Sequence, residues 1–166
     1  MKTEDKTMRQ IKVGVIGLGW FGEKHCEVLA GLPEAELAAV CTRTPARLAE
    51  VRAAFNVPKA FTDYREMLAD PVIDVVSVVT MWDQHVEPTV AALDAGKHVF
   101  LEKPMASTVA DCDRIIDAAR RSRGSLMVGH ERSRTARCQP AKPRPAQAIG
   151  QRHHEDTSQN RGPAQR

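Results

Sequence analysis

The segment GLGWFG holds the clearest chemical pattern, because Gly17, Gly19 and Gly22 stand in the spacing GxGxxG. The first glycine of such a loop permits a tight turn, the second lets the backbone approach a pyrophosphate, and the third lets a helix pack closely on a strand. Backbone N–H groups and the positive helix end then face the phosphates. We therefore expect a dinucleotide site that includes Trp20 and Phe21. The alternative, an ordinary strand-to-helix turn, is disfavoured by the matching strand and helix patterns around the loop.

The next apolar run ends with Cys41, Thr42, Arg43 and Thr44. We expect these residues to lie near the adenosine ribose. An acidic residue about 20 positions after the glycine loop normally binds the ribose 2′-hydroxyl, and Thr42 occupies its place. A 2′-phosphate is not repelled there, and Arg43 with the threonine hydroxyls can bind it through charge-assisted hydrogen bonds. We expect NADP to be preferred over NAD. The alternative is that Arg43 stacks on adenine or lies in solvent.

Two other classes of nucleotide-binding protein use similar glycine loops. Methyltransferases commonly carry an acid just before the glycines and another after the second strand, and this sequence has neither at those places. A flavin site is a further alternative, although it too usually includes the acid that binds the ribose. These absences favour a nicotinamide cofactor.

The segment HVFLEKP supplies a second chemical group at the end of a predicted strand. Residues at the carboxyl ends of strands in an open parallel sheet line the ligand crevice, which places Glu102 and Lys103 for chemistry. Lys103 can donate or accept a proton beside a nicotinamide, provided that desolvation or a neighbouring charge lowers its pKa towards neutrality. Pro104 would fix the turn that directs it. The alternative is a surface ion pair of Glu102 with Lys103, worth less than about 1 kcal/mol.

Alternating strands and helices are needed to position these residues. The hydrophobic pattern from residue 11 onward predicts such an alternation. Asp63 and either Ser107 or Thr108 are predicted helix N-caps, while Gly31 and Gly96 follow predicted helix ends. The predicted strands are residues 11–17, 36–41, 59–61, 73–79, 98–102 and 125–128, and the predicted helices are residues 20–30, 45–55, 64–69, 84–95 and 109–122. The expected fold class is therefore α/β, a doubly wound parallel sheet of the Rossmann dinucleotide-binding type.

Three segments follow one another in order along the chain, namely GLGWFG, then TMWDQHVEPTVAALDAGKHVFLEKPMA, then MVGH. With these segments the chain resembles, from Ile11 to about His130, the N-terminal domain of the Gfo/Idh/MocA oxidoreductase family, which includes glucose-fructose oxidoreductase and inositol dehydrogenases. The resemblance implies that Lys103 of the EKP motif is the catalytic residue and contacts both nicotinamide and substrate. Glu102 is its neighbour at the cofactor.

By the same resemblance, Thr80 and His85 belong to a loop after the fourth strand that lies over the cofactor. Met81 stands where the family usually has a proline, which leaves the conformation of that loop open. Taken from the residues alone, His85 equally suits a helix cap or a solvated position. Trp82 suits packing on the cofactor or on the protein.

Composition divides the chain into an N-terminal arm (residues 1–10), an NAD(P)-binding domain (residues 11–130) and a basic tail (residues 131–166). Residues 1–130 carry 16 basic and 18 acidic side chains, whereas the tail carries eight and three. The tail has no hydrophobic period and only one large aliphatic side chain, so we expect it to be disordered. It lacks interleaved aromatic residues, and we expect no nucleic-acid partner.

Other kinds of site are excluded by what the sequence lacks. No apolar run approaches the roughly 18 residues of a membrane span, and the polar N-terminus has no signal-peptide pattern, so we expect a cytoplasmic protein without a membrane partner. The four cysteines show neither CxxC pairing nor nearby histidines at metal-ligand spacing. We therefore expect no metal site.

The resemblance leaves two functions open. In the first, an NADP- or NAD-dependent oxidoreductase transfers a hydride between nicotinamide and a carbinol carbon of a sugar or polyol. In the second, the chain binds nucleotide without turnover, because the family's second α+β domain, which completes the sugar site, has no counterpart after MVGH. A reading-frame change near Arg132 is our hypothesis for the tail. Without that domain we expect a monomer, and a sugar or polyol partner only if a second domain is supplied.

Overall fold

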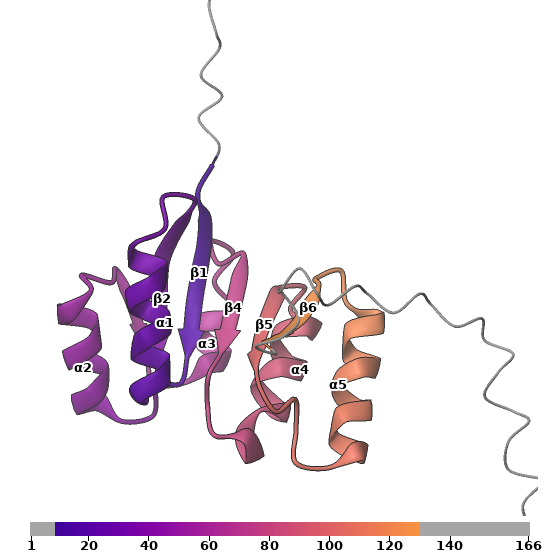
Figure 1. The fold of residues 1–166 in the computed structure, drawn as a ribbon. Helices are drawn as coiled ribbons and strands as arrows, with labels where there is room; N and C mark the ends of the chain where they lie inside the picture. Colours follow the sequence, from indigo (N-terminus) through magenta and orange to yellow (C-terminus); the bar gives the residue numbers. More distant parts are fainter. Residues whose placement is uncertain (1–8, 130–166) are drawn as a thin grey trace, which may run out of the picture. The chain divides into compact units, whose positions relative to one another are not determined.

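Six strands alternate with helices along residues 9–129, the part of the chain that the computed structural model describes (Figure 1). The bounds are β1 Ile11–Ile16, α1 Trp20–Ala30, β2 Ala35–Cys41, α2 Pro45–Ala54, β3 Lys59–Phe61, α3 Tyr64–Leu68, β4 Val75–Val78, the 3-10 helix η1 Trp82–Gln84, α4 Val86–Asp94, β5 His98–Glu102, α5 Val109–Arg121 and β6 Leu126–Gly129. The predicted tail and most of the predicted N-terminal arm lie outside the described residues. No helix of the described part is long and apolar enough to cross a membrane.

All neighbouring strands of the sheet are parallel, in the order β3-β2-β1-β4-β5-β6. The chain moves outward from β1 to β3 and then returns to the other side of β1, so β1 and β4 are neighbours at the centre. In an open α/β sheet this reversal of strand order opens a crevice at the carboxyl ends of the central strands. The predicted doubly wound Rossmann fold is confirmed.

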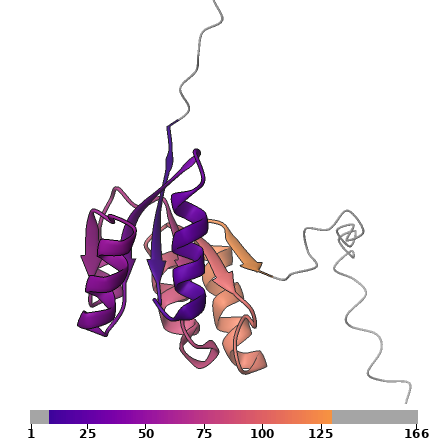
Figure 2. The same ribbon diagram turned by 60° about the vertical axis from the view of Figure 1, so that its left-hand side comes forward.

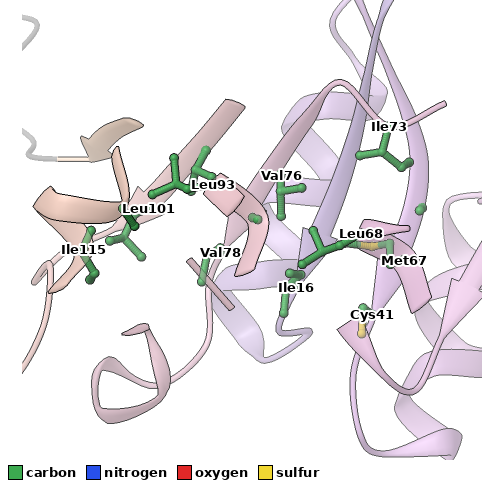
Figure 3. Packing of buried hydrophobic residues seen from close by; sticks show 14 of the residues in the cluster. Ile16, Cys41, Met67, Leu68, Ile73, Val76, Val78, Leu93, Leu101 and Ile115 are labelled. Carbon is green, nitrogen blue, oxygen red and sulfur yellow. The ribbon is translucent and has the colours of Figure 1, made fainter. Parts of the chain in front are cut away.

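Helices cover both faces of the sheet (Figure 2). On one face, Cys26 of α1 and Val51 of α2 pack with Val15 and Val40 of the central strands. On the other face, α3, α4 and α5 contribute the larger of the two hydrophobic clusters, part of which Figure 3 shows. Its fully or almost fully buried members include Met67, Leu68, Ile73, Val76, Val78, Leu93, Leu101 and Ile115. Because central strands are buried on both faces, they carry near-continuous apolar runs.

The region between β4 and α4 differs from its prediction. Residues 84–95 were expected to form one helix, but η1 ends at Gln84 and α4 begins at Val86. Pro88 explains the break, because a helix that included Gln84 would need a backbone N–H at Pro88, which proline lacks. The Gln84 carbonyl instead accepts a hydrogen bond from the Thr80 hydroxyl, at 3.2 Å. The fourth strand is also shorter than predicted, covering Val75–Val78 rather than residues 73–79.

Candidate functional site

A cavity of about 840 Å³ opens at the carboxyl ends of the strands. It is lined by the glycine loop after β1, the turn after β2, the segment after β3, the loop after β4 and the turn after β5. Nine of the predicted site residues line it together: Gly17, Gly19, Trp20, Phe21, Thr42, Arg43, Thr80, Glu102 and Lys103. The other two, Gly22 and His85, lie outside its lining.

The glycine loop connects β1 to α1 by a turn that side chains would obstruct. Gly17 has φ +95°, and a Cβ on it would stand 2.7 Å from the Val79 carbonyl group. A Cβ on Gly22 would stand only 1.9 Å from the Gly17 carbonyl oxygen, so its absence lets α1 approach the turn. Around Gly19, by contrast, a Cβ would meet no heavy atom within 4 Å. Gly19 therefore faces open space, as a residue that must leave room for a ligand would.

The beginning of α1 has the character of an anion site. Gly19 is its N-cap and supplies no side-chain hydrogen bond to the first turn. The N–H groups of a first turn have no partner within their own helix and carry the positive end of the helix dipole. Both Trp20 and Phe21 line the cavity, with exposed fractions of 74% and 44%. Phosphate oxygens would find backbone donors here, close to the Trp20 and Phe21 side chains.

The turn after β2 presents a cation and a hydroxyl to the cavity without an acidic residue. The Thr42 N–H donates to the Phe61 carbonyl of β3 at 3.2 Å, which fixes the backbone of the turn. The guanidinium of Arg43 donates to Oε1 of Gln84 at 2.9 Å, and both residues line the cavity. Asp83 also lines the cavity, so its carboxylate lies in the same region.

The turn after β5 fixes Glu102 by two contacts and leaves the Lys103 side chain without a partner among the described residues. One oxygen of Glu102 accepts the Lys103 backbone N–H at 3.1 Å, and the other lies 3.4 Å from Nε2 of His25. Within residues 9–129, the Lys103 ammonium makes no hydrogen bond or ion pair. The alternative of an ion pair between Glu102 and Lys103 is therefore not realised. Lys103 is exposed and lines the cavity.

His25 packs behind Glu102 rather than in the cavity. Its ring lies between Phe21 and Phe100, and a 2.8 Å hydrogen bond joins its Nδ1 to the Ser77 hydroxyl. Burial lowers the pKa of His25, an effect that the nearby Glu102 carboxylate only partly opposes. His25 therefore favours its neutral form and holds Glu102 as a hydrogen-bonding group.

The buried cysteines do not supply a nucleophile. Burial raises the pKa of Cys26 to about 11 and that of Cys41 to about 12. Thiolates are the reactive form of cysteine, so both groups are inert near neutral pH. Within the described part of the chain, no three histidine, cysteine or acidic residues gather as metal ligands.

Several residues line the cavity that were not singled out from the sequence. They are Leu18 in the glycine loop, Thr62 and Tyr64 after β3, Asp83 and Gln84 in η1, and Glu87 and Pro88 in α4. Thr62 and Tyr64 could have been predicted from the sequence, because the carboxyl end of a third parallel strand lies at the same sheet edge as those of the first two. Asp83 and Gln84 lie within the loop that the family resemblance assigns to the cofactor, whereas nothing in the sequence indicated Glu87 and Pro88, which fall in the helix that follows.

Comparison with known proteins agrees with this architecture. Residues 11–130 match the model of a family described as an oxidoreductase family with an NAD-binding Rossmann fold. Myo-inositol 2-dehydrogenase of Thermotoga maritima is 37% identical over 122 residues, which cover 74% of this chain and 36% of that protein. A dehydrogenase of Sphingobium sp., acting by name on 4-carboxy-2-hydroxymuconate-6-semialdehyde, is 33% identical, over 74% of this chain and 39% of its own length.

Solved structures give the same result. The scyllo-inositol dehydrogenase of Lactobacillus casei, determined with bound NAD(H) and scyllo-inositol, superposes with a TM-score of 0.66 at 30% identity. The match covers 73% of this chain and 36% of that structure. The chain thus spans somewhat more than a third of the length of these relatives. It belongs to the Gfo/Idh/MocA oxidoreductase family, with residues 11–130 as its NAD-binding Rossmann domain.

Proposed function

We propose that the cavity binds a nicotinamide dinucleotide, with the pyrophosphate against the loop from Gly17 to Gly22 and the nicotinamide near Lys103. One observation carries the proposal: nine predicted cofactor residues, from four separate segments of the chain, line one cavity of about 840 Å³. The scyllo-inositol dehydrogenase structure with bound NAD(H), which is similar over 73% of this chain, supports it. Family membership alone would support a fold, whereas this convergence supports a site.

The cavity divides into two ends with different chemistry. The turn after β2, with Thr42 and Arg43, suits the adenosine ribose, since a parallel sheet places this turn beside the glycine loop. The turn after β5, with Glu102 and Lys103, suits the nicotinamide end. The α1 N-terminus lies between them in the sheet order, where the pyrophosphate joins the two halves of the cofactor.

A fluorescence titration tests the binding proposal. Trp20 is exposed on the cavity wall, so a bound nucleotide should change its emission. Gly19→Ala is the matched variant, because its methyl group meets no protein atom and leaves the fold unchanged. That methyl group should weaken nucleotide binding by about tenfold or more, since it keeps the pyrophosphate from the backbone. Equal affinities of Gly19→Ala and the wild type would contradict the proposed phosphate site.

For cofactor choice, the features of the β2 turn favour NADP over NAD. No carboxylate directly follows β2 to bind a 2′-hydroxyl, and Arg43 offers a guanidinium there that can bind a 2′-phosphate, although Asp83 lines the same cavity. The Gln84 amide oxygen holds that guanidinium at the cavity mouth, at 2.9 Å. A phosphate would replace the neutral amide as its acceptor, because charge-assisted hydrogen bonds are the stronger ones.

Dissociation constants for NADP and NAD, measured with the wild type and Arg43→Ala, test this preference. The wild type should bind NADP more tightly. Arg43→Ala should weaken NADP binding about tenfold or more while changing NAD binding by less than about twofold, since only NADP offers the phosphate. Tighter binding of NAD by the wild type would overturn the preference.

The reaction that Lys103 beside a bound nicotinamide would support is hydride transfer to or from a carbinol carbon of a sugar or polyol. Bound nicotinamide supplies the hydride acceptor or donor. During alcohol oxidation Lys103 would accept the hydroxyl proton at a neutral Nζ, and during carbonyl reduction an ammonium Nζ would return it. The inositol dehydrogenases among the relatives support an alcohol substrate of this class.

Nucleotide binding without turnover is the second candidate. Lys103 is the one lysine that lines the cavity within residues 9–129, and neither His25 nor His85 reaches it. Holding a sugar in one orientation normally takes several convergent polar groups, and the nicotinamide end of this cavity offers few. The small number of polar groups at the nicotinamide end therefore favours cofactor binding with little turnover by this chain.

The formation of reduced nicotinamide from inositols and simple sugars separates the two candidates. Turnover that Lys103→Ala abolishes, while ADP-ribose, which lacks nicotinamide, still binds, would establish the dehydrogenase. Tight nucleotide binding with no turnover on any polyol would establish the second candidate.

A further inference from the structure

His85 is a buried histidine that connects two loops of the cavity without lining it. It stands between η1 and α4, and only 1% of its surface is exposed. Its Nδ1 lies 2.9 Å from the carbonyl oxygen of Pro104, in the turn after β5. Its Nε2 lies 3.1 Å from the carbonyl oxygen of Thr80, in the loop after β4. One ring thus bridges the two segments that flank the nicotinamide end.

The chemistry of these contacts identifies the ring as a donor. Carbonyl oxygens only accept hydrogen bonds, and a neutral imidazole has a single N–H. The shorter contact is to Pro104, the residue directly after Lys103. This hydrogen bond joins the buried His85 ring to the backbone directly after Lys103, so losing it would remove a restraint on the turn.

The turn that carries Lys103 is held on both flanks. Before Lys103, the Glu102 carboxylate meets His25 and the Lys103 N–H. After Lys103, His85 meets the Pro104 carbonyl. The Lys103 ammonium itself makes no hydrogen bond or ion pair with residues 9–129. The backbone at Lys103 is therefore fixed while its side chain stays available to the cavity.

We propose that His85 is a positioning residue for Lys103, acting by a hydrogen bond from its Nδ1 to the Pro104 carbonyl, and that it does not contact the cofactor. This inference rests on the proposed nicotinamide site. The family resemblance implies that His85 belongs to a loop over the cofactor, and the inference gives it an indirect role in that loop. Removing the Nδ1 donor should move Lys103 and weaken only the nicotinamide half of cofactor binding.

Two single-donor variants give the first test, because asparagine can place an N–H where Nδ1 is and glutamine can place one where Nε2 is. The measured quantity is the dissociation constant of NAD divided by that of ADP-ribose, which differs from NAD in lacking nicotinamide. His85→Asn should keep this ratio near the wild-type value, whereas His85→Gln should raise it about tenfold. Equal ratios for the two variants would overturn the inference.

A double mutant gives the second test. If His85 acts through Lys103, His85→Gln should add no loss in a Lys103→Ala background, since residues that act as a unit are not additive. Full additivity of the two losses would show that His85 acts elsewhere and would overturn the inference. The double mutant therefore separates positioning of Lys103 from a general structural effect.

His98→Leu is the control for losing any histidine hydrogen bond. His98 accepts the Ser125 N–H at the other end of β5, at 3.2 Å. This variant should leave the nucleotide ratio unchanged, and a raised ratio would count against a specific role for His85.

ADP-ribose binding distinguishes this inference from the proposed function. A wild type that fails to bind ADP-ribose overturns the nucleotide site itself, and with it this inference. If the wild type binds ADP-ribose and the His85 variants have the wild-type ratio, the inference about His85 is overturned and the proposed nucleotide site stands.

Discussion

Gly22 is the residue of the glycine loop whose replacement tests packing rather than ligand binding. In Gly22→Ala the new methyl group would overlap the Gly17 carbonyl oxygen, so α1 must move away from the turn. We expect the free energy of unfolding to fall by about 3 kcal/mol, as in other overpacked sites. Urea unfolding of Gly22→Ala measures the loss.

Gly31→Ala is the matched control for that variant. Gly31 caps the other end of α1, and a Cβ there would meet no atom closer than 3.6 Å. Its free energy of unfolding should stay within about 0.5 kcal/mol of the wild-type value. If both alanine variants unfold at the same urea concentration, close packing at Gly22 is not what the glycine provides.

His25 makes the stability of the domain depend on pH. Its pKa is lowered by burial, so the folded domain binds a proton there less readily than the unfolded chain does. The stability contributed by neutral His25 is present above the unfolded pKa of about 6.5 and is lost as the pH falls from that value towards the folded pKa. The free energy of unfolding of the wild type should therefore decrease as the pH is lowered from 7 to 5.

His25→Asn isolates this effect, because asparagine cannot take up a proton but can still hydrogen-bond to Ser77. Urea unfolding at several pH values should show a smaller decrease for the variant than for the wild type. Parallel decreases in the two proteins would mean that another group is responsible.

Residue types and spacing predict the parts of the site that local chemistry determines. The glycines, Thr42 with Arg43, and Glu102 with Lys103 could be selected because each follows a strand at the same sheet edge. The burial of His85 could not be predicted, since its two contacts come from Thr80 and from Pro104, 19 residues away. A lone histidine gives no sign in the sequence of which carbonyl groups it will meet.

At the scale of elements, the two helix N-caps predicted from side-chain chemistry form as expected. The predicted cap Asp63 accepts the Arg65 N–H at 2.9 Å, and Thr108 accepts the Asp111 N–H at 3.1 Å. Strand ends were predicted less well, as in the fourth strand, because apolar residues such as Ile73 stay buried beyond the strand itself. Capping is local and readable from sequence, whereas strand length depends on neighbouring strands.

The cap of α5 can be tested against its neighbour. Thr108→Ala removes the oxygen that accepts the Asp111 N–H and should cost about 1 kcal/mol of stability. Ser107→Ala removes the adjacent hydroxyl, the other residue that the sequence allowed as a cap, and should change the stability little. Thermal unfolding of both variants provides the comparison, and an equal or larger loss in Ser107→Ala would assign the cap to Ser107.

At the scale of the whole described domain, one sheet joins two hydrophobic clusters. Val15 and Val40 pack on the face of α1 and α2, while Val76 and Val78 pack on the face of α3, α4 and α5. Because these residues alternate along neighbouring central strands, neither cluster can lose its packing without disturbing the strands that support the other. We expect both faces to unfold together, as small single domains usually do.

A ligand in the cavity should then stabilise the whole domain, because the cavity is lined by segments that follow five of the strands. Nucleotide at 100 times its dissociation constant should raise the free energy of unfolding by about 2.7 kcal/mol, which corresponds to a rise in Tm of about 10 °C for a domain of this size. Trp20 fluorescence reports the cavity and far-UV circular dichroism reports the helices on both faces. The two signals should shift together in the wild type. In Gly19→Ala at the same nucleotide concentration they should shift by about half as much or less, since tenfold weaker binding leaves about 1.4 kcal/mol of stabilisation. A shift of the fluorescence signal alone would show that the two faces unfold separately.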